Sequence, residues 1–282
     1  MRAVLTPSCR EELFTLLERH PGALPLAGGT DLLVRLRRQA LQDEHPLLCL
    51  AGVAELQGIC EQETTIAIGA ATTFSRIITD PLVLRHAPLL ARAAQTIGGP
   101  AVRNMATIGG NIRTASPAGD SLPPLYMLEA QIEIASRRAT RVLPIGEFIT
   151  GPGQTTLRDG ELISRILLPR GASSHCQSFE KIGRRRSMAI SVTSFAGWVR
   201  LCSDGSIEEA RFAWGSVAPT VLRIPALEKE LVGVPLDAAI IRHAAHIVSH
   251  SVSPISDIRA TAQYRRIVAG KLLVRFLEGL RG

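Results

Sequence analysis

The sequence predicts an α+β protein with an N-terminal part that alternates strands and helices and a C-terminal part with a hairpin and two helices. Three observations support this prediction. In the N-terminal part, a short apolar run stops at Gly28-Gly29 and a helical segment follows. Farther along, two apolar runs flank Ser203-Asp204-Gly205-Ser206, a strong hairpin signal. The chain then finishes in two segments with helical patterns, about 236–249 and 261–279.

The N-terminal elements can be placed from turn and capping residues. Ser8-Cys9-Arg10-Glu11 matches a capping box with leucines at helical spacing behind it, and Pro21-Gly22 ends that helix. A buried strand at 24–27, the glycine turn at 28–31 and a helix at 32–36 come next, an arrangement in which backbone N–H groups can face a phosphate. Further strands are expected at 47–50, 64–69, 132–134 and 161–168, and further helices at 89–97 and 123–128.

The C-terminal part is expected to begin after Pro169-Arg170-Gly171, which closes the last of these strands. Beyond this boundary, the runs 188–201 and 207–217 are expected to form the two strands of the hairpin. The chain has no internal repeat of solenoid length.

Composition indicates an ordinary soluble protein, which we expect in the cytoplasm. Apolar residues make up 46% and charged residues 20%, and no run approaches the roughly 18 apolar residues of a membrane helix. The N-terminal Met1–Leu5 lacks the apolar core of a secretion signal. The five cysteines are scattered without a CxxC pair, so the sequence predicts no metal or iron–sulfur site in this chain.

The net charge of +7 raises the question of nucleic-acid binding. Only two tyrosines and two tryptophans are available for base stacking, and the arginines are spread over several clusters, so we expect no nucleic-acid partner. A basic surface could equally meet an acidic partner subunit or an anionic cofactor.

A second glycine stretch, Ala106–Ile112, continues through Ser116-Pro117 to Asp120 and shares its chemistry with residues 26–31. Either glycine pair alone could be a tight turn, and neither matches the Rossmann or phosphate-loop pattern. Their similarity, about eighty residues apart in two expected sheets, favours a cleft that holds one diphosphate-bearing cofactor. Asp120 could bind a ribose or cap the helix that follows it, and Lys181 could be partly buried or a solvated lysine at a strand end.

These motifs, taken in order, resemble the FAD-binding medium subunits of molybdenum hydroxylases, and among them the xanthine dehydrogenase FAD subunit. The resemblance covers nearly the whole chain and rests on Leu26–Leu33, Ile66 with Gly69-Ala70 and Thr72-Thr73, Arg103-Asn104, Thr107–Asn111, Thr150–Gly153, Ala218–Thr220 and Tyr264–Arg266.

The resemblance implies a PCMH-type FAD-binding domain, residues 1–172, made of two α/β subdomains at about 1–57 and 58–172. It implies a smaller C-terminal domain of the CO dehydrogenase flavoprotein type, residues 173–282, with a three-stranded antiparallel sheet and helices.

The resemblance also implies a noncovalently bound FAD and its ligands. The corresponding positions are Leu24, Pro25, Leu26, Ala27, Gly28, Gly29, Thr30, Asp31, Leu32, Ile97, Thr107, Ile108, Gly109, Gly110, Asn111, Thr114, Asp120, Ile163, Ser164 and Lys181. Residues 24–31 would hold the diphosphate through backbone N–H groups, and Thr107–Asn111 would form the second loop. Thr114 and Asp120 would reach the cofactor and its adenosine ribose, and Lys181 would lie near the flavin pyrimidine edge. Ile97 stands where some relatives have an aromatic residue, and Ser164 is polar where the family is often apolar.

The implied function is electron transfer, with no catalytic acid or base in this chain. Molybdopterin in a large partner would oxidise the substrate, two [2Fe-2S] clusters in a small partner would carry electrons, and FAD would pass them to NAD or another acceptor. Two alternatives are a stand-alone FAD-dependent oxidoreductase, which would need its own substrate pocket, and a noncatalytic nucleotide-binding protein.

Overall fold

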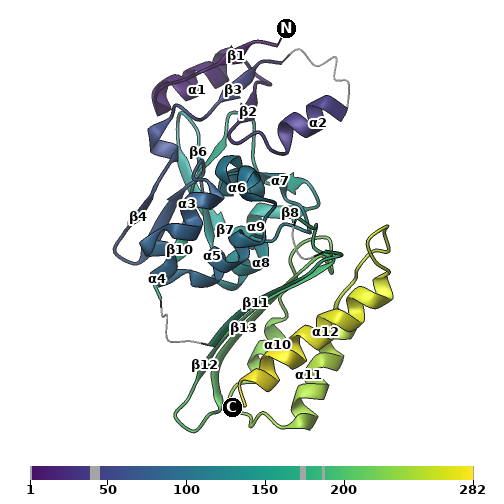
Figure 1. Cartoon of the computed structure of the whole chain (residues 1–282). Helices are drawn as coiled ribbons and strands as arrows, with labels where there is room; N and C mark the ends of the chain where they lie inside the picture. Colours follow the sequence, from purple (N-terminus) through teal and green to yellow (C-terminus); the bar gives the residue numbers. More distant parts are fainter. Residues whose placement is uncertain (1, 39–44, 172–175, 186–187, 282) are drawn as a thin grey trace.

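The computed structural model describes residues 2–38, 45–171, 176–185 and 188–281. The expected domain boundary at 172–173 therefore lies outside the described residues. Figure 1 shows the described chain as three stacked units, each built around a sheet.

The first unit is a small parallel sheet at the N-terminal end of the molecule (Figure 1). Its strand order is β1-β3-β2, and its helices follow the strands as the sequence predicts. Leu13 and Phe14 of the first helix pack with Leu48 in its core. The elements are β1 (Val4–Leu5), α1 (Arg10–Arg19), β2 (Leu24–Leu26), α2 (Leu32–Arg38) and β3 (Leu47–Cys49).

The second unit is a five-stranded antiparallel sheet with the order β4-β5-β10-β6-β7, covered by short helices. Its strands are β4 (Ile59–Glu61), β5 (Thr65–Gly69), β6 (Gln131–Ala135), β7 (Thr140–Pro144) and β10 (Leu162–Pro169), with a separate pair β8 (Ile149–Gly151) and β9 (Gln154–Thr155). Its helices are η1 (Ala54–Leu56), α3 (Phe74–Thr79), α4 (Pro81–His86), α5 (Pro88–Gln95), α6 (Pro100–Met105), α7 (Ile108–Thr114), α8 (Leu122–Met127) and α9 (Ile145–Phe148).

The third unit is the antiparallel sheet β11-β12-β13 with three helices. The three-stranded antiparallel C-terminal sheet is as expected. Its elements are β11 (Cys176–Ile182), β12 (Thr193–Leu201), β13 (Ile207–Gly215), α10 (Pro225–Glu230), α11 (Ala238–Ser251) and α12 (Ala262–Gly279).

The period of two along these strands gives the third sheet two different faces. Phe195 and Trp214 lie opposite each other on one face and pack with Phe276 of α12. Lys181 pairs with Ser194 in the register, so both belong to the other face, which packs against α5 and α8 of the second unit. The sheet is therefore buried between the second unit and the C-terminal helices, and it presents Lys181 to the second unit.

Three sequence predictions need correction. The capping box does not form, because Ser8 Oγ donates to Glu12 rather than Glu11 and the cap residue Cys9 makes no side-chain cap bond. The first hairpin strand begins at Thr193 instead of 188, since Met188 has a left-handed φ of 53° that breaks extended pairing. The stretch 108–111 is not an open loop but the first turn of α7, which Thr107 caps.

Candidate cofactor-binding site

The first glycine loop leaves a row of backbone donors available. It runs from Ala27 to Asp31 at the carboxyl end of β2 and leads into α2. None of the five N–H groups of these residues donates to an acceptor in the described part of the chain. Ala27, Gly28 and Gly29 are half-buried, and Thr30 and Asp31 are exposed. Half-buried N–H groups normally have a partner, so a row of free donors that starts at this strand end suits an anionic ligand such as a diphosphate.

The two glycines of this loop are needed for different physical reasons. A Cβ on Gly28 would lie 1.8 Å from the carbonyl oxygen of Met105, so this glycine lets the loop pack directly against the end of α6. Gly29 has a φ of 68°, in the left-handed region that side chains disfavour. The glycine pair therefore fixes both the packing of the loop and the direction of its N–H groups.

The second glycine stretch uses its backbone N–H groups within the fold, whereas the resemblance implies that it forms the second cofactor loop. The N–H groups of Ile108 and Gly109 donate to Thr72 O and Ala70 O. Gly110 N–H donates to Thr107 Oγ1, and Asn111 N–H donates to Thr107 O. These donors are already used within the fold, so the residues 108–111 leave no backbone N–H group free for a ligand.

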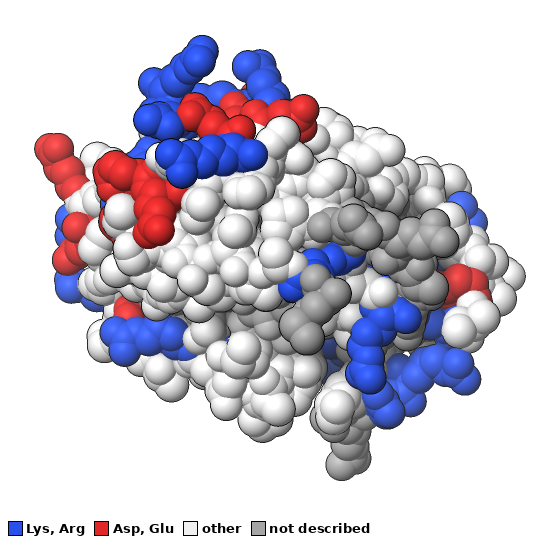
Figure 2. Space-filling view, turned by 90° about the horizontal axis from the view of Figure 1, so that it is seen from above, with Lys and Arg blue, Asp and Glu red and all other residues white. Residues whose placement is uncertain are grey.

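The side chains of α7 bring the second stretch to the first. Thr114 Oγ1 lies 3.5 Å from Asp31 Oδ2, and Asp31 forms an ion pair of 3.1 Å with Arg35. Arg113 lies near the same arginine: desolvation first, and the like charge of Arg35 second, lower the pKa of its guanidinium. An anion beside these two cations would relieve their repulsion, which supports a phosphate position at this end of the site. Figure 2 shows basic side chains gathered on the side of the molecule where α2 lies.

Asp120 and Lys181 form a buried ion pair between the second and third units. Their Oδ2 and Nζ atoms are 2.5 Å apart, and their side chains are only 8% and 10% exposed. Lys181 Nζ also donates to Thr96 O at 3.0 Å, which places it beside Ile97. Lys181 is therefore not a solvated lysine at a strand end. Asp120 does not cap α8, because the cap residue is Ser121 and no side-chain cap bond forms.

The pair also changes where Asp120 could act. The resemblance assigned Asp120 to the adenosine ribose and Lys181 to the pyrimidine edge, which lie far apart in FAD. In the structure the two side chains touch, so they face the same part of any ligand. Asn111 supports this position, since its Oδ1 accepts a hydrogen bond of 2.6 Å from Ser121 next to Asp120.

Unpartnered buried polar atoms lie in this ion pair and beside it. Asp120 Oδ1 has no partner among the described residues, and neither has the hydroxyl of Ser194. The hydroxyls of Ser191 and Thr193 are also unpartnered, but Thr193 lies on the Phe195 face of the sheet, away from Lys181. Ser194 lies next to Lys181 across the strands, and a Cβ on Gly215 would come within 2.4 Å of its Oγ. Sequence reasoning missed these hydroxyls, although small polar residues within the apolar run 190–195 were a visible signal. Unpartnered oxygens of this kind fit a polar ligand group at the contact between the second and third units around Asp120 and Lys181, which we call the seam.

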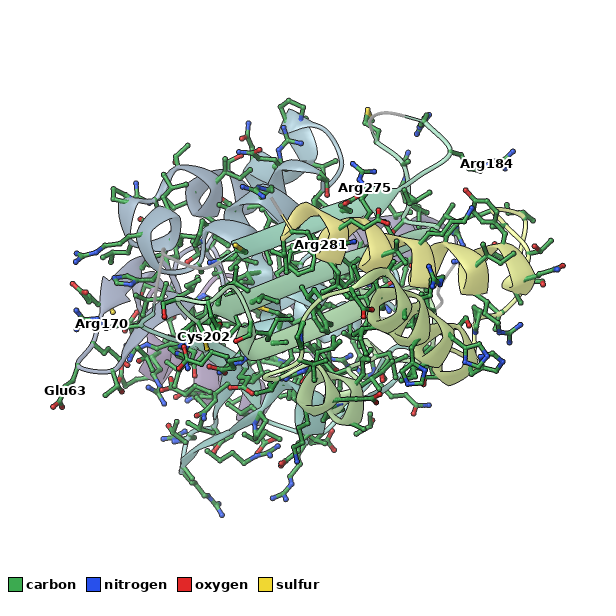
Figure 3. The ribbon with its side chains drawn as sticks, turned by 90° about the horizontal axis from the view of Figure 1, so that it is seen from below. Glu63, Arg170, Arg184, Cys202, Arg275 and Arg281 are labelled. Atoms are coloured by element: carbon green, nitrogen blue, oxygen red, sulfur yellow. The ribbon has the colours of Figure 1, made fainter. Side chains whose placement is uncertain are left out.

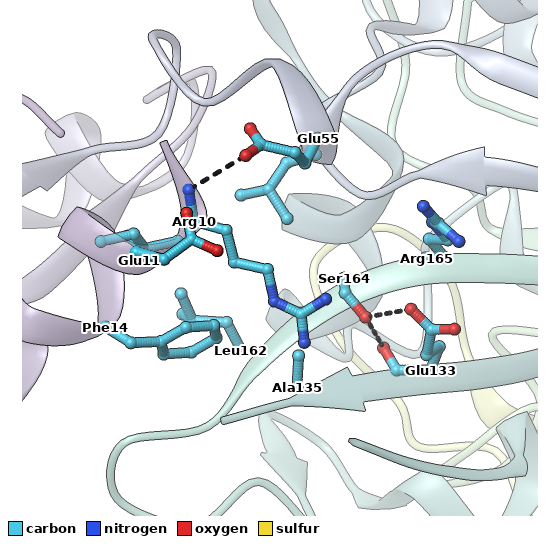
Figure 4. A pocket seen from close by; sticks show the side chains of 11 residues that line it. Arg10, Glu11, Phe14, Glu55, Glu133, Ala135, Leu162, Ser164 and Arg165 are labelled. Carbon is cyan, nitrogen blue, oxygen red and sulfur yellow. Dashed lines mark hydrogen bonds between the residues drawn. The ribbon is translucent and has the colours of Figure 1, made fainter. Parts of the chain in front are cut away.

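Two residues of the expected FAD set, Ile163 and Ser164, make other contacts in the fold. Ile163 is buried in the core of the second unit. Ser164 Oγ donates to Glu133 and lines a separate cavity of about 160 Å³ that also contains Arg10 and Arg165 (Figure 4). No other residue of the expected FAD set lines that cavity, so the side chain of Ser164 is separated from the rest of the set.

Comparison with known proteins places the chain in a family. Residues 1–171 match the family model "FAD binding domain in molybdopterin dehydrogenase", and residues 177–280 match "CO dehydrogenase flavoprotein C-terminal domain". The fold and the site thus define a FAD-binding oxidoreductase subunit. The chain belongs to the family of FAD-binding medium subunits of molybdenum hydroxylases.

Individual relatives agree over most of their length. The xanthine dehydrogenase FAD-binding subunit of Escherichia coli O157:H7 is 36% identical over 90% of this chain and 87% of its own. The carbon monoxide dehydrogenase medium chain of Hydrogenophaga pseudoflava is 32% identical over the same shares. A solved carbon monoxide dehydrogenase structure from that organism superposes with a TM-score of 0.93 at 31% identity, covering 99% of this chain and 97% of the other.

Within the described ranges, no helix has the length and apolar character to span a bilayer, and no group of three or more histidine, cysteine or acidic side chains could hold a metal ion.

The Asp120 carboxyl predicts an unusual pH dependence of stability. Burial, partly offset by Lys181, raises the pKa of Asp120 from 3.8 to about 6. The folded protein therefore binds this proton more tightly than the unfolded chain, so the stability it adds is full below about pH 4 and is lost as pH rises through 6. The free energy of unfolding of the wild type minus that of Asp120→Asn should fall between pH 4.5 and 6.5, by up to about 1.4 kcal/mol per pH unit.

Urea unfolding at several pH values measures this difference. The exposed hairpin variant Asp204→Asn serves as the control and should not produce the same fall with pH, because hydrogen bonds from Ser206 lower the pKa of that carboxyl. A difference that rises with pH for Asp120→Asn would contradict the assignment.

Proposed function

We propose that this chain is the electron-transfer subunit of a molybdenum-containing dehydrogenase, with FAD bound noncovalently. Electrons would come from two [2Fe-2S] clusters of a small partner, after substrate oxidation at molybdopterin in a large partner, and would leave to NAD or another acceptor. The single observation that carries the cofactor assignment is the row of five free N–H groups from Ala27 to Asp31. Family membership supports the direction of the electron flow.

The residues present fit both ends of FAD. The free donors of the first loop, with Arg35 and Arg113 nearby, would hold the diphosphate. At the seam, Lys181 and the orphan oxygen of Asp120 would hold the pyrimidine edge of the flavin, which carries an N–H donor between two carbonyl acceptors. An ammonium and a carboxylate side by side complement this donor and acceptor pattern. This placement moves Asp120 from the ribose to the flavin.

The chain supplies binding and electrostatics, and the chemistry is that of the cofactor. FAD, when bound, accepts and delivers electrons singly or in pairs. Lys181 contributes a positive charge where the reduced flavin is anionic, and Asp120 limits that charge because the two side chains form an ion pair. The buried seam around them keeps water from this edge, which strengthens both effects.

The two alternatives make different demands on the chain. A stand-alone oxidoreductase needs an acid–base residue in a substrate pocket beside the flavin, and a noncatalytic protein has no need of a buried ion pair at the cofactor edge. FAD-loaded chain without partner subunits should not oxidise purines or aromatic N-heterocycles, and the reconstituted complex with molybdenum and iron–sulfur subunits should do so. Turnover by the isolated chain would contradict the subunit assignment.

The first loop is tested by replacing its left-handed glycine. We expect Gly29→Ala to lower the affinity for FAD at least tenfold, because the substitution shifts the loop that carries the free donors. Gly233→Ala is the matched control: its φ is 70°, close to that of Gly29, but nothing lies within 4 Å of its Cβ position. Flavin absorbance per chain after reconstitution and gel filtration measures retention. Equal retention in both variants would show that the first loop does not hold the cofactor.

The ion pair is tested by changing each charge separately. Asp120→Asn leaves Lys181 uncompensated and should raise the midpoint potential of the bound flavin, whereas Lys181→Met should lower it. Lys181→Arg keeps the charge and should leave the potential near the wild-type value. Dye-coupled redox titration of each FAD-loaded variant gives the potentials. Shifts of the same sign in both variants, or none, would contradict the placement of this pair at the flavin.

A further inference from the structure

The two most exposed large apolar side chains in the described part of the protein lie three residues apart, in the loop between α11 and α12. Ile255 is 72% exposed and Ile258 is 89% exposed. On the first two turns of α12, Tyr264 and Ile267 are each 48% exposed. The α11–α12 loop (residues 252–261) and the start of α12 thus present apolar side chains to solvent.

This loop is held in place rather than loosely attached. Asp257 accepts from the N–H groups of Arg259 and Ala260 and forms ion pairs of 2.7 Å with Arg259 and Arg265. Arg184 donates to the carbonyl of Ile258 at 3.0 Å. Such a network fixes the backbone between the two isoleucines, so their exposure is built into the fold.

The same network connects the loop to the seam that holds Lys181. Arg265 is only 3% exposed and donates to Val192 O and Ser216 O at the ends of the C-terminal strands. Val192 N–H in turn donates to Ile182 O, next to Lys181. The loop is therefore rigidly linked to the strand end beside the proposed flavin site.

The charge around the loop is positive. Asp257 is the single acidic residue between 252 and 270, and its ion pairs with Arg259 and Arg265 offset it. Arg266 is exposed beside Ile267, and Arg184 reaches the loop from the opposite segment. Figure 3 shows Arg184 projecting at the edge of the molecule, on the side where this loop leads into α12. A surface with this charge repels a second copy of itself and attracts an acidic protein.

We propose that the α11–α12 loop and the first turns of α12 dock the small iron–sulfur subunit, through an apolar patch with an acidic rim on that partner. This inference rests on the proposed electron-transfer function, which requires the electron donor to sit close to the flavin. Ile255 and Ile258 are the apolar anchors, and Arg266 and Arg184 attract the acidic rim.

The apolar anchors are tested by a double variant. Ile255→Ser/Ile258→Ser should retain FAD as the wild type does and should bind the purified small subunit at least tenfold more weakly. Leu84→Ser/Val232→Ser removes two other exposed apolar side chains, 49% and 44% exposed, and should bind normally. Titration in a biosensor gives the affinity, and flavin absorbance gives the FAD content. Unchanged affinity in the double variant overturns the docking surface.

The charge complementarity is tested in the same assay. Arg266→Glu should weaken binding at low salt, with a smaller effect at high salt, and Arg85→Glu on the exposed surface of α4 should change nothing. Equal effects of both variants overturn the acidic rim.

Two further outcomes are distinguished by sedimentation of the wild type and the double variant, and by binding of the small subunit to the wild type. A wild-type dimer that the double variant converts to a monomer would assign the surface to a second copy and overturn the proposed partner. Wild-type chain that retains FAD but binds no small subunit overturns the proposed electron-transfer function itself, independently of the loop.

Discussion

The ion pair between Asp120 and Lys181 is the interaction on which the site depends, because it places two buried charges where the C-terminal sheet shares a core with the second unit. Asp120 follows the second glycine stretch, and Lys181 comes from the first strand of the C-terminal sheet. Both charges are buried, so either one alone would be costly, and each offsets part of the cost of burying the other. In the proposed site, the C-terminal domain therefore takes part directly in holding the cofactor.

The glycine stretches divide the work in a way that composition does not reveal. The first offers its backbone N–H groups, and the second uses its own to fasten α7 against Ala70 and Thr72. Gly109 is needed because a Cβ there would come within 2.6 Å of the Ala70 side chain. One glycine pair thus leaves its backbone donors free for the proposed ligand, and the other uses its donors to hold α7 in place, although the sequence patterns look alike.

Five strands of the N-terminal units, β2, β3, β5, β6 and β10, were predictable from their apolar runs. The strands β4 and β7 were not, since the turns beside them at 62–64 and 136–139 carry neither glycine nor proline. The hairpin at 203–206 was predictable because its turn carries Asp204-Gly205. The helix at 108–114 has a local cap, in which Thr107 Oγ1 accepts from Gly110 N–H, but its glycine pair is equally typical of an open loop. Local patterns could not show that Lys181 meets Asp120, which is 61 residues away. Ser164 was expected among the cofactor residues, and only the register of β10 shows that its hydroxyl meets Glu133 instead.

The small size of the first unit has a consequence for the chain without its cofactor. Its sheet has three short strands, and its core is formed by few residues, so on its own this unit opens more easily than the rest of the molecule. A ligand held by the loop after β2 binds only the closed form and stabilises it by mass action. In the proposed site, the cofactor would therefore act as a folding partner of the N-terminal unit, and loss of flavin would expose this end of the chain first to proteases.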